Sequence, residues 1–577
     1  MSIGNFINVF YLFLIIQSLL TISVLSFPNC IKEKFEKFIC FRLGKLNDKQ
    51  LLILLKIFTF ILCISILMIP GHMQGHDNIF HIARISALSE GLKNGQFPVL
   101  VYPKYYNEYG YANGIFYPDI LLYFPAFLTL LGVPVFKSYE ILLFLIIIGA
   151  YMSMYFSCYK ITNSDYTASI FGLLYTTCSY FLVDLYTRSA IGEAQAFIYF
   201  PLVIYGFYSI ACGDVKEGKY FTIGIVGLVL SHIISTVICI ILVLLMTVAF
   251  FKNFLNEKKR FLYLIIFGLF SIATTLFFTL PLLEIMRSDV FKYSVVRPGK
   301  TTRNAVNPLF TIIECSYDGL TKKYIPQGIG IVFVYLFFIC RPYLFKVKNS
   351  FSKKMFYVGC FFLFMSTYLF PWKIAYRVLD IIQFPWRLYM CSTLCLLFAY
   401  MLPLSEKTTN KKRKIISGLI ICCFCVFTVS ITTVNLFKTF YTRATDYTYE
   451  TMSAEYLPLD VKVEEIAKRG EIISSNNKLE SSFKREGTNI LINYRFNKKG
   501  DNNYLELPLI YYKGYKAIEK GHKLLVEKGN NGLVRIYPIG ENGSISVYYG
   551  FTQFRIIGIV LSLINTIIFI VFNKKTY

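Results

Sequence analysis

The stretch ILLFLIIIGAYMSMYFSCY, residues 141–159, decides the fold class of this chain. It contains no charged side chain and is long enough to cross about 30 Å of hydrocarbon as a helix. In lipid a segment must satisfy its own backbone groups, which a helix does and an open strand does not. Similar runs recur along the chain, and we expect an all-α polytopic membrane protein with about 13 transmembrane helices. The runs lie near residues 6–27, 51–70, 118–136, 140–159, 169–183, 196–212, 219–251, 261–285, 329–345, 356–372, 388–404, 415–437 and 554–572.

The overall composition supports this class and argues against others. Hydrophobic residues make up 55% of the chain and charged residues 16%, whereas soluble domains carry about 25% charged residues. The net charge of +25 comes from Lys and Arg in short loops, as in membrane proteins, so we expect no nucleic-acid partner. None of the 15 cysteines lies within 438–551, which argues against a disulfide scaffold or a zinc module there.

The charge of the loops predicts the topology. Cytoplasmic loops of membrane proteins carry an excess of Lys and Arg, and four connectors and the C-terminal NKKTY are basic. We therefore expect a multi-pass membrane protein with 438–551 outside the cytoplasm. The basic connectors are 31–50, 252–260, 346–354 and 406–414, and the expected external loops are 71–117, 286–328, 373–387 and 438–553.

The orientation of residues 137–218 stays open at this stage. Pro125 interrupts the run 118–136, which is compatible with a re-entrant segment. The run 219–251 has the length of one tilted helix or of two short ones. Either alternative reverses the side of the membrane on which the following loops lie.

The chain divides into four parts by composition. Residues 1–50 hold an additional N-terminal helix and a basic loop, residues 51–437 the main transmembrane domain, and residues 552–577 a last helix with a basic tail. Residues 438–551 are β-rich, because alternating segments are separated by the turn signals GDNN, KGNNG and GENG. We expect a binding or scaffolding sandwich of at most seven strands, with the aromatic segment YYKGY (511–515) as one of them. The expected strand segments are Asn489–Phe496, Tyr504–Tyr512, Lys523–Glu527, Gly532–Tyr537 and Ser544–Tyr549.

The densest polar cluster is GHMQGHDNIFHIARI, residues 71–85, with His76, Asp77, His81 and Arg84. On a helix that begins near Asp77, His81 and Arg84 lie on the same face. A carboxylate beside imidazoles can act as a general base or as a metal ligand. The alternative is structural, because Asp is a favourable helix N-cap.

Two further groups lie within or between apolar runs. Arg188 and Glu193, in YTRSAIGEA (186–194), are candidates for a site or for a simple surface ion pair. His232 lies deep in an apolar run; ionisable groups there usually face a cavity or a partner, although a neutral His bonded to a neighbouring helix is equally compatible.

The third group is cationic. FPWK (370–373) and FPWR (384–387) hold the only two Trp residues, and interfacial Trp is a common membrane anchor. Arg387 at a helix entrance matches the geometry of a phosphate. The run KYSVVRPGKTTR (292–303), expected outside, breaks the topology rule. It indicates either an anionic partner or the decoration of a soluble face through Lys292, Arg297, Lys300 and Arg303.

Taken together, several segments resemble one group of bacterial membrane proteins, the "6-pyruvoyl-tetrahydropterin synthase-related" family. This family is similar to the YfhO-like proteins and the wider GT-C glycosyltransferases, and the resemblance runs from about residue 70 to the C-terminus. The zinc-binding His pattern of the soluble pterin enzyme is absent from the sequence. The segments are GHDNIFHIARI, NGQFPV, GYANGIFYPDILLYFPAFL, RSAIGE, GLVLSH, IQFPWR and ELPLIYYKGYKA.

The resemblance implies an inverting GT-C glycosyltransferase that uses a polyprenyl-phosphate sugar donor. Asp77 then matches the acidic residue of the first external loop, Glu193 a second acidic residue, and Arg387 the group that binds the donor phosphate. A divalent cation is a candidate cofactor, and a cell-envelope glycan or polymer is the expected acceptor. The aromatic segment YYKGY (511–515) would stack on the sugar rings of that acceptor, although exposed Tyr is common in any sandwich. The location that the resemblance implies is the bacterial plasma membrane. The additional helix 6–27 departs from the pattern. The alternatives are a lipid or polysaccharide transporter or flippase, and a non-catalytic scaffold of envelope assembly.

Overall fold

The computed structural model describes residues 43, 45–69, 72–73, 75–295, 306–312, 316–318, 323–325, 328–346, 350–439, 441–442, 454–497 and 502–575. The expected helix 6–27 and most of the basic loop 31–50 lie outside the described residues. So do three of the four cations expected to bind an anion, Arg297, Lys300 and Arg303.

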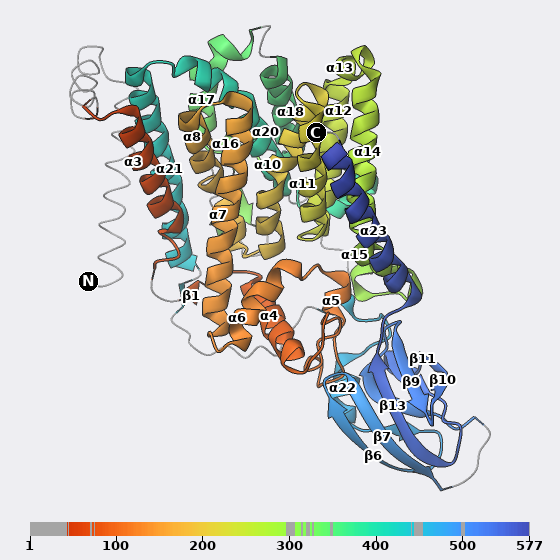
Figure 1. The fold of residues 1–577 in the computed structure, drawn as a ribbon. Helices are drawn as coiled ribbons and strands as arrows, with labels where there is room; N and C mark the ends of the chain where they lie inside the picture. The colour runs from red at the N-terminus through yellow and green to blue at the C-terminus, as the bar shows by residue number, and fades with distance from the viewer. Residues whose placement is uncertain are drawn as a thin grey trace.

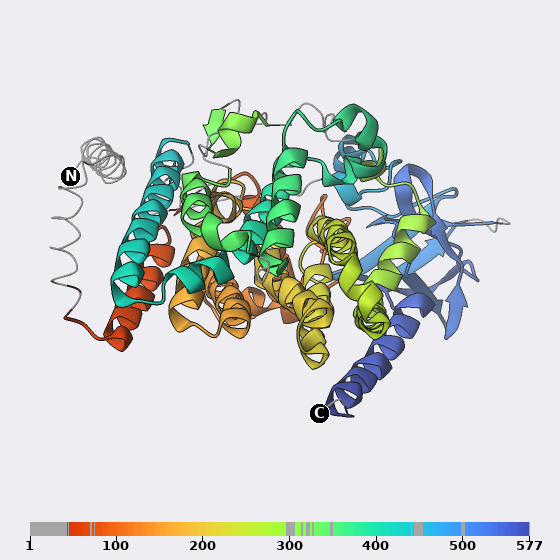
Figure 2. The ribbon, with the colours of Figure 1, turned by 90° about the horizontal axis from the view of Figure 1, so that it is seen from above.

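A bundle of apolar helices forms the body of the molecule, and a smaller β structure lies beyond one of its ends (Figures 1 and 2). The long apolar runs of the sequence form these helices because a helix satisfies its backbone groups internally. The bundle helices are α3 (Asp48–Ile64), α7 (Val135–Thr162), α8 (Asp165–Thr176), α10 (Ile191–Ala211), α11 (Lys219–Val229), α12 (Ile233–Ala249), α14 (Lys258–Thr274), α15 (Leu276–Ser288), α17 (Ile331–Leu344), α18 (Ser350–Ser366), α20 (Tyr389–Lys407), α21 (Lys411–Thr439) and α23 (Gln553–Lys575).

The expected number of about 13 spans is not confirmed. Among the described residues, five helices are long and apolar enough to cross a membrane, or up to seven if each of two bent pairs is one span. Before α7 begins at Val135, the run 118–136 contains the 3₁₀ turn η1 (Ile120–Leu122) and α6 (Tyr123–Leu130), and the 8 residues of α6 rise about 12 Å. The run 219–251 is broken at 230–232 into α11 and α12, which corresponds to the alternative of two short helices.

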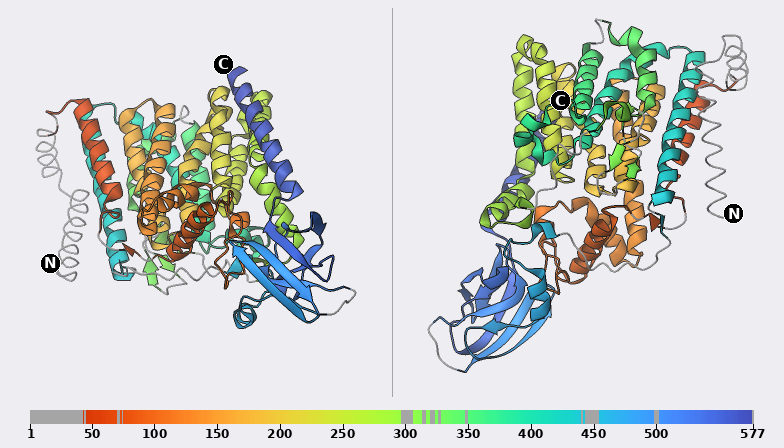
Figure 3. Two further views of the ribbon diagram at one scale, coloured as in Figure 1. Left: turned by 60° about the horizontal axis from the view of Figure 1, so that its bottom comes forward. Right: turned by 180° about the vertical axis from the view of Figure 1, so that it is seen from behind.

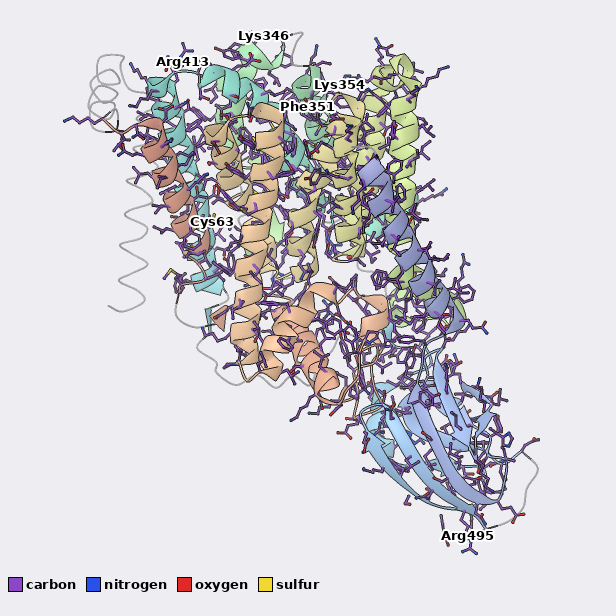
Figure 4. The ribbon with its side chains drawn as sticks, viewed as in Figure 1. Cys63, Lys346, Phe351, Lys354, Arg413 and Arg495 are labelled. Carbon is purple, nitrogen blue, oxygen red and sulfur yellow. The ribbon has the colours of Figure 1, made fainter. Side chains whose placement is uncertain are left out.

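The basic connectors gather at one end of the bundle. Figure 4 shows Lys346, Lys354 and Arg413 at the end opposite to Arg495, which lies at the tip of the β structure. Lys354 Nζ donates to Asn253 Oδ1 at 2.7 Å, which joins two of these connectors directly. We call this end the basic end and the opposite one the β end.

The orientation of 137–218 relative to these ends is now visible. Lys160 Nζ, near the C-terminus of α7, lies 3.4 Å from Glu217 Oε2. Arg260, in the basic connector 252–260, donates to the Gly213 carbonyl at 3.0 Å. The turns that follow α7 and α10 are therefore both at the basic end, and the segment 184–190 between α8 and α10 faces the β end.

The β structure consists of two sheets with a common apolar core. The five-stranded sheet has the order β10-β9-β13-β7-β6 and the four-stranded sheet β11-β12-β8-β5. β7 and β13 bury alternate residues, as a half-buried strand should, and β8 is buried throughout. The strands are β5 (Ser474–Ser475), β6 (Leu479–Glu486), β7 (Asn489–Phe496), β8 (Leu505–Ile510), β9 (Tyr515–Glu519), β10 (His522–Leu524), β11 (Val526–Lys528), β12 (Leu533–Ile536) and β13 (Asn542–Tyr549).

Two expectations for this β-sandwich are wrong. The described residues form nine strands here, against the seven or fewer expected, because β6 and β9 do not stand out as alternating apolar segments. The segment YYKGY is not a strand but mainly the connection from β8 to β9. Tyr512 and Tyr515 are buried, so they cannot stack on a sugar.

The β-sandwich is attached to the segment that follows the helix α4 (Asn78–Lys93). Ile510 N donates to the Tyr109 carbonyl at 2.8 Å, and Tyr109 Oη donates to the Gly470 carbonyl at 2.6 Å. Figure 3 shows α4 at the β end of the bundle, beside the sandwich. The segment that carries the first polar cluster is thus held between the bundle and the sandwich.

Candidate functional site

The loop before α4 lies directly against the segment between α8 and α10. His76 N donates to the Thr187 carbonyl at 3.1 Å and Asp77 N donates to the Arg188 carbonyl at 2.9 Å. A Cβ on Gly75 would lie 2.0 Å from Ser189 Oγ, so only glycine permits this approach. These contacts bring the first two polar clusters of the sequence together.

Asp77 occupies the N-cap position of α4 but does not cap the helix with its side chain. Its carboxylate forms no hydrogen bond with the described part of the chain, so the structural alternative for this residue is not supported. Surrounding protein atoms desolvate the Asp77 carboxyl and raise its pKa above the ordinary value, although the residue is exposed at its surface, and the positive charges of Arg188, His76 and Arg387 oppose this shift. The carboxylate is therefore accessible and lies in the electric field of two guanidinium groups.

Glu193, in the first turn of α10, holds those two guanidinium groups. Its Oε2 lies 2.9 Å from Arg188 Nη1 and 3.1 Å from Arg387 Nε. Its Oε1 accepts from Tyr180 Oη at 2.6 Å. Glu193 is fully buried and Arg188 is 8% exposed, so the simple surface ion pair considered from the sequence is wrong. A buried carboxylate of this kind needs such charged partners.

A π-helical turn, η2 (Val183–Thr187), positions Arg188 relative to Asp184. Such turns are frequent at functional sites. Arg188 Nη1 lies 2.6 Å from Asp184 Oδ1 and 3.0 Å from Tyr180 Oη. Within the described part of the chain, no hydrogen bond uses Nε or Nη2 of Arg188. Asp184 Oδ2 is buried and has no hydrogen bond to the described residues either.

Arg387 reaches Glu193 from the 3₁₀ turn η8 (Pro385–Leu388), which leads into α20. Its Nη1 donates to the Ile382 carbonyl at 3.1 Å and to Gln383 Oε1 at 2.6 Å. Among the described residues, Nη2 of Arg387 takes part in no hydrogen bond. The side chain is thus fixed through Nε and Nη1, and Nη2 can still donate.

A second buried ion pair joins Arg84, on α4, to Asp119. Arg84 is fully buried, and its Nη2 and Nε contact Asp119 Oδ1 at 2.5 and 3.1 Å. Tyr102 Oη donates to Asp119 Oδ2 at 2.6 Å. His81 Nδ1 lies 3.0 Å from Arg84 Nη1, and burial together with the Arg84 charge keeps the pKa of His81 well below its ordinary value. His81 is therefore neutral and Arg84 is committed to Asp119.

Tyr117 connects this ion pair with the Glu193 cluster. The Arg84 guanidinium lies 4.0 Å from the centre of the Tyr117 ring, and the His232 ring lies 6.1 Å from it. His232 Nδ1 accepts from Ser235 N at 3.2 Å and caps α12. A Cβ on Gly192 would lie 2.3 Å from Tyr117 Oη, so glycine is required at this contact.

All eight candidate residues therefore lie in one region at the β end of the bundle. The structure links Asp77, Arg188, Glu193 and Arg387 through backbone contacts and ion pairs, with His76 beside Asp77. Arg84, His81 and His232 join through Tyr117. Trp372, considered as a membrane anchor, is instead buried, and its Nε1 donates to the Met365 carbonyl at 3.0 Å.

A divalent cation does not fit the residues present. Among the described residues, no group of three or more His, Cys, Asp or Glu side chains is placed to hold a metal ion. Glu193, Asp184 and Asp119 are already matched by arginines, and a metal ligand set needs carboxylates that can turn to the ion. We therefore assign no role to a metal.

The sequence reasoning missed four residues of this region: Asp119, Tyr117, Tyr180 and Asp184. Asp184 carried a signal, because Asp184 and Arg188 are spaced i,i+4 at the end of an apolar run. The two tyrosines carried none, since Tyr is abundant in this chain, and Tyr180 is distinguished by its hydroxyl contact with Glu193 and Tyr117 by its ring contact with Arg84.

The sequence model of the family described as bacterial membrane protein YfhO matches residues 116–453. The chain belongs to this family. Of the groups named in the sequence analysis, the YfhO resemblance is thus confirmed, and the chain is a membrane protein. The matched range contains Glu193, Arg387 and His232, whereas Asp77 and the β-sandwich lie outside it.

Two further proteins are similar to this YfhO family member. An uncharacterized protein of Lactococcus lactis subsp. cremoris (strain MG1363) is 26% identical over 325 residues, which are 52% of this chain and 50% of the relative. The chain thus spans about half the length of that relative. The archaeal oligosaccharyltransferase AglB from Archaeoglobus fulgidus, solved with an inhibitory peptide and a dolichol-phosphate, shares 13% identity and a TM-score of 0.36, over 67% of this chain and 56% of that chain.

Proposed function

We propose that this YfhO family member is a multi-pass membrane glycosyltransferase of GT-C type. It transfers a sugar from a polyprenyl-phosphate donor to an extracytoplasmic acceptor, such as a cell-envelope glycan. The observation that carries the proposal is the Asp77 carboxylate. It forms no hydrogen bond with the described residues and lies within electrostatic reach of Arg188 and Arg387. The similarity of the YfhO-like proteins to the GT-C glycosyltransferases, stated in the sequence analysis, supports the same function.

The proposed topology follows from the charge of the two ends. The basic end holds the connectors around Lys346, Lys354 and Arg413 (Figure 4) and is assigned to the cytoplasm, where Lys and Arg accumulate. The β-sandwich and the Asp77 region then face the outside. A donor with a long polyprenyl tail reaches such a site through the bilayer, and a polymer acceptor reaches it from outside.

The proposed reaction needs a base and a cationic site for the leaving group. Asp77 accepts the proton of an acceptor hydroxyl while that oxygen attacks the anomeric carbon of the sugar. The bond from this carbon to the phosphate oxygen breaks, and polyprenyl phosphate leaves with the electron pair. Hydrogens on Arg188 Nε and Nη2 and on Arg387 Nη2 stabilise the charge that develops on the phosphate.

Glu193 has a positioning role in this scheme. It binds both arginines through one oxygen and leaves Nε and Nη2 of Arg188 and Nη2 of Arg387 without a hydrogen bond among the described residues. A carboxylate already held by two guanidinium groups is a poor base, because protonation would break both ion pairs. Of the two acidic residues expected to be catalytic, Asp77 therefore takes the proton and Glu193 orients the cations.

The test is sugar transfer in membranes supplied with a radiolabelled polyprenyl-phosphate sugar. Asp77→Asn should lower transfer by about 10²–10⁴-fold, the usual contribution of a general base, with protein level and thermal stability unchanged. Asp214→Asn is the matched control, because Asp214 does cap its helix and lies at the basic end; it should retain full transfer. Near-normal transfer by Asp77→Asn would overturn the proposal and favour a scaffold or a flippase.

A further inference from the structure

A short helix beside the candidate site exposes an apolar surface that the proposed chemistry does not use. Helix α19 (Trp372–Leu379) lies between α18 and α20, at their ends away from the basic end. Ile374 and Val378 are each 79% exposed, the highest values among the large hydrophobic side chains described. Exposed apolar side chains that lie together indicate contact with a membrane or another protein and not with water.

The arrangement of side chains around α19 is amphipathic. Ile374 and Val378 are spaced i,i+4 and lie on one stripe, and Lys373 and Arg377 form the neighbouring stripe with the same spacing. Neither cation forms an ion pair with the described part of the chain. Cations on one stripe and aliphatic side chains on the next are typical of helices that lie in the plane of a membrane surface.

The helix is fixed to the bundle by its first residue. Trp372 is 3% exposed, packs edge-on against Phe370 at 5.1 Å and donates through Nε1 to the Met365 carbonyl. The remaining turns therefore project from a rigid attachment, with Tyr368 and Leu369 exposed just before them. This apolar surface is continuous with the ends of two helices of a membrane protein, so lipid is the occupant that the position favours.

We propose that α19 is an interfacial helix in the leaflet at the β end of the bundle. Ile374 and Val378 insert between the lipid chains, and Lys373 and Arg377 bind the phosphate groups of anionic lipids. The attraction of cations to such phosphates is the expected source of lipid selectivity.

The position of α19 connects this surface to the candidate site. The turn η7 (Asp380–Ile382) follows directly, and the Ile382 carbonyl and the Gln383 side chain are the groups that fix Arg387. A lipid phosphate bound at Arg377 is thus one short turn from the arginine cluster. The identification of this lipid as the glycosyl donor rests on the proposed function. The membrane contact of α19 is independent of that function.

Quenching of tryptophan fluorescence by brominated lipids tests the membrane contact. The full-length protein is reconstituted in dibrominated phosphatidylcholine as wild type, Ile374→Trp and Leu491→Trp. Trp372 and Trp386 are buried and serve as the common background. The fluorescence added at position 374 should fall by about twofold, as expected for an interfacial side chain. Leu491 is 49% exposed on β7, and the fluorescence added there should not change.

The lipid preference tests the role of the cations. Dibrominated phosphatidylglycerol should bind near Ile374→Trp more tightly than phosphatidylcholine, and removal of each cation should weaken this preference about fivefold. The variant that combines Lys373→Gln and Arg377→Gln measures the loss of the preference for phosphatidylglycerol when both cations are removed. It disturbs no ion pair among the described residues. Equal quenching at positions 374 and 491 would overturn the membrane contact, and equal binding of the two lipids would overturn the phosphate site. Both results are independent of whether Asp77→Asn transfers sugar.

Discussion

Replacing Glu193 by Gln should destabilise the protein strongly, although the side chain keeps its size. Glu193 is fully buried and carries the negative charge shared by Arg188 and Arg387. Without it, the Arg387 guanidinium keeps, among the described residues, the Gln383 side-chain oxygen, the Ile382 carbonyl and the Phe384 ring as partners, and none of them carries a negative charge. Breaking a buried ion pair from one side costs about 3–5 kcal/mol, because the remaining charge stays buried without compensation.

A smaller change is expected for Asp184→Asn, which provides the comparison. Among the described residues, the Asp184 carboxylate has one hydrogen-bond partner, Arg188, through Oδ1, and Arg188 still retains Glu193. The expected cost is therefore about 1–3 kcal/mol, the range for one lost charged hydrogen bond. The measurement is denaturant-induced unfolding in detergent micelles, followed by far-UV circular dichroism.

A double-mutant cycle isolates the ion pair. When Arg387→Gln is added to Glu193→Gln, no unpaired guanidinium remains at that position. The free energy of unfolding of the double variant should therefore fall by about 1–3 kcal/mol less than the summed losses of the two single variants. Additive effects, or a Glu193→Gln variant within about 0.5 kcal/mol of wild type, would refute the reasoning that Glu193 holds this cluster together.

Three other predictions concern the site and the topology. Gly192→Ala should lower the free energy of unfolding by about 1–3 kcal/mol and reduce sugar transfer, because the added Cβ would lie 2.3 Å from Tyr117 Oη. Thermal unfolding and the transfer assay measure these effects, and unchanged stability and transfer would contradict the close contact. Desolvation raises the pKa of Asp77, so its carboxylate is lost on acidification above the ordinary value of about 4. Transfer should fall there while the protein stays folded, and a pH profile of transfer that begins to fall only near pH 4 would argue against Asp77 as the base. A cysteine at Ser482, exposed on β6, should react with an impermeant maleimide in intact cells, whereas native Cys212, exposed at the basic end, should react only after lysis; the reverse would invert the proposed topology.

Much of the local structure follows from the sequence alone. Within the described residues the apolar runs form helices, and β7 covers the predicted segment Asn489–Phe496 because its apolar residues alternate. The basic connectors were expected on one side, and the structure gathers them at one end. Strand β6 (LESSFKRE) escaped prediction since most of its residues are exposed, so no alternation marks it.

Tertiary structure alone decided how the polar residues pair. The sequence marked Asp77, Glu193 and Arg387 as unusual, but it could not show that Glu193 meets Arg387, 194 positions further along, or that Arg84 is committed to Asp119. Nor could it show that the Asp77 side chain forms no capping hydrogen bond with α4. Helix formation depends on the apolar character and periodicity of neighbouring residues, which a single sequence displays. Ion pairing between helices depends on their packing and rotation, which are set by contacts between distant segments.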